Sequence, residues 1–74
     1  MKKLIIDMDK CKHILIDIGK KPNLTELHRV TGITLPTIDK YASGAVFTSA
    51  KADKIAAALG VSVFDILSEV EVKE

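Results

Sequence analysis

The spacing of four glycines limits what this chain can fold into. Gly19, Gly32, Gly44 and Gly60 each follow a short run of apolar residues at helical spacing. Glycine readily adopts the left-handed backbone that follows many helices. We therefore interpret the four glycines as helix ends and not as part of a phosphate-binding loop, and the pattern predicts a series of short helices.

Residues that favour helix starts divide the chain at matching positions. Asn23 with Glu26 three residues later forms a capping box, and Ser62 with Asp65 forms another. Pro36 is tolerated in a first helical turn, which has no intrahelical partner for its N–H. The expected N-caps of five helices are Asp9, Asn23, Thr34, Thr48 or Ser49, and Ser62.

The two ends of the chain are less clear. Residues 1–8, MKKLIIDM, form an arm, a short strand or the first turn of a helix, and the three adjacent apolar residues do not decide between these. Residues 69–74, EVEVKE, are expected to be a frayed acidic tail. The fold class predicted for residues 1–74 is all-α, a single compact domain of five helices with an N-terminal arm.

Composition excludes several classes of protein. A chain of 74 residues with 47% hydrophobic residues and a net charge of +1 fits one small helical domain with only a few kcal/mol of stability, not a strongly basic nucleic-acid binder. His13 and His28 lack the spacing of a metal or catalytic pair, so we expect no enzyme activity, metal or cofactor. Cys11 is the only cysteine and excludes an internal disulfide. Asp7 and Asp9 interrupt the first apolar residues, so we expect a cytoplasmic protein without a membrane segment.

The central segment has the pattern of a helix, a short turn and a second helix. The expected core of this unit is Leu27, Gly32, Ile33, Ile38 and Tyr41. The stretch "LTELHRVTGITLPTIDKYASG", followed by "ADKIAAALGVSVFDIL", resembles the Xre/Cro-type helix-turn-helix family of phage and bacterial repressors over about residues 11–68. The resemblance implies five helices around one core, a helix-turn-helix at about residues 23–44, and a bacterial host cell.

Comparison with the family pattern shows several departures. Leu24 and Leu35 stand where the family often has polar residues that reach a phosphate and a base edge, and leucine offers a base only apolar contact. His28 stands where the family usually has alanine, and we interpret it as packing over the helix crossing and not as a pH switch. Asp39 would face phosphates unless it accepts a hydrogen bond from a cytosine or belongs to a protein interface.

Two functions follow from these departures. The first is a phage-type antirepressor, similar to the modulator-of-repression proteins, that binds a partner repressor and binds DNA weakly. The alternative is a Cro-like homodimeric repressor that reads an operator; antitoxin and plasmid-control roles stay open. No small-molecule ligand is evident. The candidate partner-binding residues are Leu24, Leu35, Pro36, Asp39 and Val46. The candidate DNA-binding residues are Thr34, Leu35, Thr37 and Lys40 at the major groove, with Lys20, Lys21 and Lys51 near phosphates.

Overall fold

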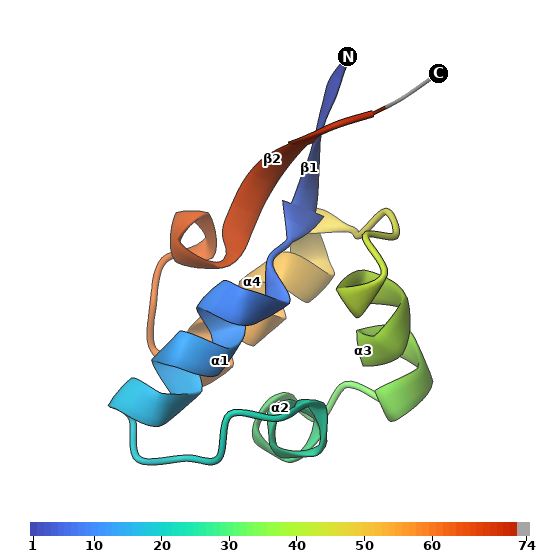
Figure 1. The fold of residues 1–74 in the computed structure, drawn as a ribbon. Helices are drawn as coiled ribbons and strands as arrows, with labels where there is room; N and C mark the ends of the chain where they lie inside the picture. Colours follow the sequence, from blue (N-terminus) through green and yellow to red (C-terminus); the bar gives the residue numbers. More distant parts are fainter. Residues whose placement is uncertain (73–74) are drawn as a thin grey trace.

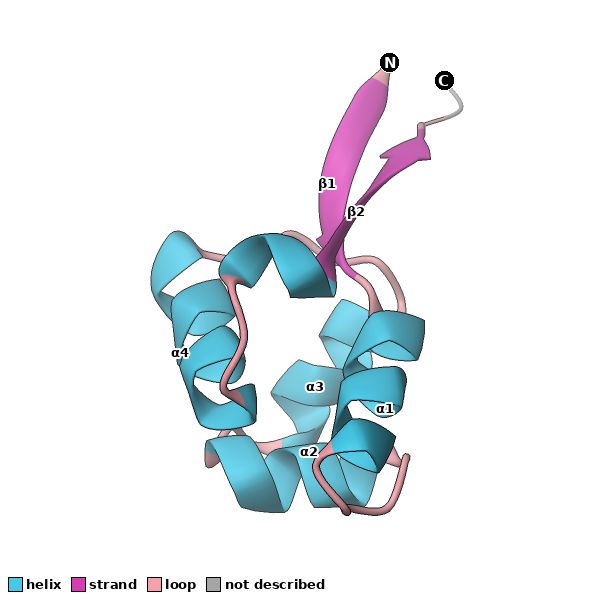
Figure 2. Ribbon diagram, turned by 90° about the vertical axis from the view of Figure 1, so that its left-hand side faces the viewer, coloured by secondary structure: helices cyan, strands magenta, loops and turns pink. Residues whose placement is uncertain are grey.

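The computed structural model describes residues 1–72, which form a mostly helical domain with a small sheet (Figure 1). In chain order the elements are β1 (Lys2–Ile6), α1 (Met8–Asp17), α2 (Leu24–Thr31), α3 (Leu35–Ala42), α4 (Ser49–Leu59), the 3-10 helix η1 (Val63–Ile66) and β2 (Leu67–Glu71). The helices enclose a small core, while β1 and β2 project from one end of the molecule (Figure 2).

Most helix ends are set by the expected local signals. The side chain of Asn23 accepts a hydrogen bond from the Glu26 N–H at 2.7 Å, and Thr48 accepts one from the Lys51 N–H at 3.2 Å. Gly32 follows α2 in the left-handed conformation, with φ of +75°. These contacts satisfy main-chain groups that have no partner inside the helix.

The start of α1 differs from the expectation. Asp7, and not Asp9, is the N-cap: the Asp7 carboxylate accepts hydrogen bonds from the N–H groups of Asp9 and Lys10. The Ser68 hydroxyl donates to the second carboxylate oxygen of Asp7 at 2.7 Å. Asp9 is exposed in the first turn, where its charge only complements the helix dipole.

The expected fifth helix and frayed tail are wrong. The capping box of Ser62 and Asp65 is present, but it starts a single 3-10 turn, and β2 follows directly. β2 pairs antiparallel with β1, with Lys2 opposite Glu71 and Ile6 opposite Leu67. Residues 69–71 therefore belong to a strand, and residues 1–8 contribute the strand β1 and the start of α1; residues 73–74 of the predicted tail lie outside the described residues.

The core draws on every helix and on the base of the sheet. Ile6, Leu15, Leu27, Ile38, Ile55 and Ile66 are its largest fully buried aliphatic side chains. Cys11 lies among them with no exposed surface. Burial, with a smaller contribution from the charge of Asp7, raises the pKa of the Cys11 thiol to about 11, so the thiol is protonated and unreactive at neutral pH. None of the helices in residues 1–72 is long and apolar enough to cross a membrane.

We expect Asp7→Ala to lower the free energy of unfolding by about 0.5 to 2 kcal/mol at neutral pH, the usual effect of removing an N-cap. The hydrogen bond from Ser68 lowers the pKa of Asp7 below 3.8, and those from the Lys10 and Asp9 amides lower it further, against an opposing effect of burial. This stabilisation is therefore complete above about pH 4 and is lost as the pH falls through the folded-state pKa.

Thermal unfolding followed by circular dichroism, near pH 7 and near pH 2, measures this effect. The difference between the wild type and Asp7→Ala should shrink at the lower pH. Asp9→Ala is the matched control, because Asp9 is acidic and lies in the same turn without capping it. An equal loss of stability in the two variants would contradict the assignment of Asp7 as the cap.

Candidate nucleic-acid interface

The turn between α2 and α3 fixes the two helices against each other. Leu27 on α2, Ile33 in the turn, and Ile38 and Tyr41 on α3 are all buried, with at most 6% of their surface exposed. The left-handed conformation of Gly32 reverses the chain directly after α2. The residues expected to form this small apolar core therefore do lie together, and α3 has one buried face and one outward face.

Hydrogen bonds that the sequence did not reveal hold the same turn. The buried hydroxyl of Thr31 donates to the Leu27 carbonyl at 2.7 Å and accepts from the Ile33 N–H at 3.2 Å. The Nδ1–H of half-buried His28 donates to the Ile33 carbonyl at 2.6 Å. His28 thus bonds to the main chain of the turn, which gives this larger residue a structural role where the family usually has alanine.

The outward face of α3 carries polar groups at its N-terminal end. Thr34 and Lys40 are exposed, and Leu35 and Thr37 are half-buried. Thr34 occupies the N-cap position but does not cap the helix; its hydroxyl instead lies 3.0 Å from the hydroxyl of Thr37. The four residues expected at the major groove are therefore close together on the first two turns of α3.

The expected phosphate-binding lysines do not lie together. Lys51 is in the first turn of α4, which begins shortly after the loop that follows α3. Lys20 and Lys21 belong to the loop between α1 and α2, and Figure 1 shows that loop on the side of the molecule opposite α3. Of these three lysines, the fold leaves Lys51 as the one nearest to the face of α3.

The five candidate partner-binding residues are also spread apart. Leu24 is half-buried and packs against the core. Val46 is 86% exposed but lies beyond the C-terminal end of α3. The length of α3, about 12 Å, separates Val46 from Leu35 and Pro36 at the start of the helix. Asp39 is exposed on the middle of α3. Leu35, Pro36 and Asp39 thus lie within about one turn of each other on α3, while Leu24 and Val46 lie elsewhere.

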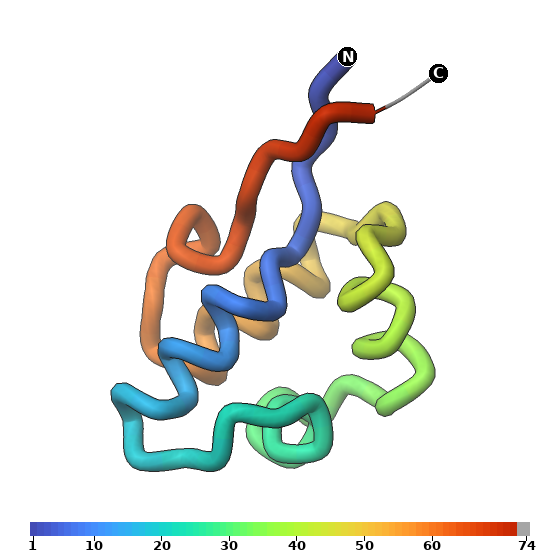
Figure 3. Tube along the Cα trace, in the orientation of Figure 1, coloured from blue at the N-terminus to red at the C-terminus, as the bar shows by residue number. Residues whose placement is uncertain are grey.

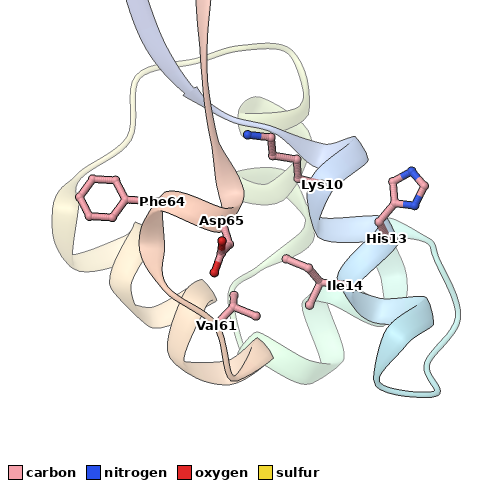
Figure 4. A pocket seen from close by; sticks show the side chains of 6 residues that line it. All are labelled: Lys10, His13, Ile14, Val61, Phe64 and Asp65. Carbon is pink, nitrogen blue, oxygen red and sulfur yellow. The ribbon is translucent and has the colours of Figure 1, made fainter.

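An open hollow of about 400 Å³ lies between α1 and η1, lined by Lys10, His13, Ile14, Val61, Phe64 and Asp65 (Figure 4). Its charged groups already have partners: Lys10 donates to the Leu67 carbonyl at 2.7 Å, and Asp65 accepts from the Ser62 N–H at 3.0 Å. Among residues 1–72, no group of three His, Cys, Asp or Glu side chains is placed to hold a metal ion.

A buried turn that fixes a second helix so that one of its faces points outward is characteristic of the helix-turn-helix class of DNA-binding domains. Comparison with known families supports this class directly. The Cro/C1-type HTH DNA-binding domain family matches residues 12–71, and the chain belongs to this family. Searches of curated proteins and of solved structures gave no match to the chain.

Proposed function

We propose that this protein is a transcriptional regulator that places the N-terminal half of α3 in the major groove of DNA. One observation carries the proposal: exposed Thr34 and Lys40 and half-buried Thr37 lie along a helix whose other face is fixed by buried Ile38 and Tyr41. In helix-turn-helix proteins the N-terminal residues of the second helix contact base edges. The family match to a DNA-binding domain supports the same function.

The side chains on this face determine what the helix can read. The hydroxyls of Thr34 and Thr37 can donate to or accept from base edges, and Leu35 can contact the methyl group of thymine. Such contacts discriminate less between bases than the paired hydrogen bonds of an arginine or an amide. We therefore propose a regulator with modest sequence specificity that favours thymine opposite Leu35.

Affinity for the DNA backbone has few sources on this face. Lys40 lies on α3, and Lys51 lies in the first turn of α4. A cation in the first turn of a helix opposes the helix dipole, so Lys51 does not stabilise α4 by its charge. A DNA phosphate at the start of α4 would interact favourably both with Lys51 and with the dipole. Two lysines give a weak clamp, so the affinity should depend on salt with a shallow slope.

Lys51→Glu should weaken binding to duplex DNA by about tenfold at low salt, because it removes one phosphate contact and adds a repulsive charge. Its thermal midpoint should be unchanged or higher, since an acidic residue suits the first turn of a helix. Fluorescence anisotropy with labelled duplexes, repeated over a salt series, measures the affinity. Lys21→Glu is the matched control, because it makes the same charge change on the far side from α3; equal losses in both variants would argue against a phosphate at α4.

A second candidate function is favoured by Asp39. This carboxylate lies on the outward face of α3, and within residues 1–72 it forms no ion pair. The Asp39 carboxylate repels DNA phosphates. The same carboxylate would attract an arginine or lysine on the surface with which a second regulator binds DNA. Leu35 and exposed Pro36 supply apolar surface beside it. On this basis the protein acts as an antirepressor that covers the DNA-reading helix of a partner repressor.

The two proposed functions predict different results in one experiment. Light scattering after size exclusion, with and without a repressor encoded beside this chain, detects a complex; gel shifts with that repressor's operator show whether the complex still binds DNA. A stable complex that no longer shifts the operator supports the antirepressor. Specific operator binding by this chain alone, with no complex, supports direct DNA reading.

A further inference from the structure

Within residues 1–72, the outer edge of β1 has no partner strand. β1 and β2 form a two-stranded ribbon that projects beyond the helices (Figures 2 and 3). A ribbon of two strands is only marginally stable in water, and a free edge is a template for another strand. Leu4, in the middle of β1, is 52% exposed although it is apolar. This edge therefore has both the main-chain groups and the apolar surface that favour a further strand.

The hydrogen bonds of the ribbon show which main-chain groups point outward. The Val72 N–H donates to the Met1 carbonyl, and the Asp7 N–H donates to the Ile66 carbonyl, each at 2.8 Å. In an antiparallel pair, hydrogen-bonded positions alternate with positions whose groups face away. The main-chain N–H and C=O groups of Lys2, Leu4 and Ile6 therefore face the free edge of β1.

The outer edge of β2 is less available. Lys10 donates to the carbonyl of Leu67, which is one of the outward-facing groups on that edge. Glu69 and Glu71 occupy the other outward-facing positions of β2. Two copies of β2 that paired edge to edge about Glu69 or its neighbour Val70 would place carboxylates directly opposite each other, which is unfavourable. A second copy is therefore better accommodated by β1.

We propose that β1 is a homodimer interface, at which β1 of a second copy pairs antiparallel about a two-fold axis at Leu4. The two ribbons then form one four-stranded sheet, with Leu4 packed against its counterpart. The main-chain N–H and C=O of Leu4 exchange two hydrogen bonds with the same groups of the second copy, as in other additions of a strand to a sheet edge. Each copy contributes the same surface, so the assembly closes as a dimer.

Charge and burial select this axis over the neighbouring ones. An axis at Lys2 or at Lys3 would place two lysines directly opposite each other. An axis at Ile5 or Ile6 would bring the second copy against the base of the ribbon, where Ile6 is only 1% exposed. Leu4 is the position in β1 that avoids both costs, and its exposed side chain gains cover from the pairing.

The contact is small, so we expect a dimer that dissociates on dilution. Sedimentation velocity of the full chain over a concentration series should show a mass that rises from one copy to two. Amide hydrogen exchange by NMR adds a local readout: the Leu4 N–H should become protected as the concentration rises. The proposal does not rest on DNA binding by α3, and both measurements are made without DNA.

Leu4→Lys should weaken dimerisation by about tenfold or more, because two lysines would then meet at the axis. Leu4→Pro should do the same by removing the outward N–H, while the bonds between β1 and β2 stay intact. Val46→Lys is the matched control, since it makes the same change at an exposed apolar site outside the ribbon. Circular dichroism checks that each variant is folded.

Three results would overturn the proposal. One is a wild-type protein that stays monomeric at NMR concentrations. Another is a dimer that both folded Leu4 variants keep, or that Val46→Lys loses equally. The third is growth into larger assemblies, which would indicate open-ended pairing of β1 with β2 of the next copy.

Discussion

Ile38→Ala should lower the free energy of unfolding by about 2 to 5 kcal/mol, the usual cost of removing a buried isoleucine side chain and leaving a cavity. Ile38 has no exposed surface and lies where α3 packs on the rest of the core. A domain of this size has only a few kcal/mol of stability in total. We therefore expect the variant to be largely unfolded at room temperature and to lose DNA binding with its fold.

Urea unfolding followed by circular dichroism measures the loss. Ile38→Val, which removes a single methylene group, should cost about 1 kcal/mol and stay folded. Lys40→Ala, on the exposed face of the same helix, should leave the stability nearly unchanged. An Ile38→Ala protein with the wild-type unfolding midpoint would show that α3 is oriented differently against the core.

Asp39→Lys should raise the affinity for duplex DNA by about tenfold at low salt. The slope of log affinity against log salt concentration should become steeper by the amount expected for about one additional phosphate contact. The reason is that the substitution removes a carboxylate from the exposed face of α3 and adds a cation there. If the protein is an antirepressor, the same substitution should weaken its complex with the partner repressor, because the carboxylate no longer attracts a basic residue.

Anisotropy titrations with duplex DNA and calorimetry with the repressor separate these effects. Asp17→Lys is the control, because it makes the same charge change at the end of α1, on the side away from α3 (Figure 1). If Asp39→Lys and Asp17→Lys raised the DNA affinity equally, the gain would reflect net charge alone. In that case α3 would not be the surface that meets DNA.

The helices were predictable because their signals are local. Asn23, Thr48 and Ser62 each bond to a main-chain N–H no more than three residues away, and Gly32 and Gly60 take up the left-handed conformation directly after a helix. Such contacts depend on short stretches of chain, so spacing alone reveals them. The buried face of α3 followed from the same kind of pattern.

The sheet could not be predicted because its partners lie at opposite ends of the sequence. The alternating residues of "EVEVKE" fit a strand, but a strand needs a partner, and nothing near residue 69 supplies one. The N-cap of α1 was assigned to Asp9 although the capping contacts of Asp7 are local, because both aspartates precede or begin the same apolar run; only the bond from Ser68 to Asp7 depends on β2. Similarly, spacing could not show that Lys20 and Lys21 lie on the other side of the molecule from α3.

The contact between Lys3 and Gly44 has a consequence for how the protein is made. Lys3 Nζ donates to the Gly44 carbonyl at 2.9 Å, just beyond the end of α3. β1 can take up this position only after residues 67–71 have been synthesised, because β2 is its only partner strand within residues 1–72. During translation α2 and α3 leave the ribosome long before β2, so they are produced before the ribbon that braces the end of α3. Pairing of such distant segments closes a long loop and is a slow step. We therefore expect α3 of the nascent chain to be braced by this contact only after residues 67–71 have been synthesised.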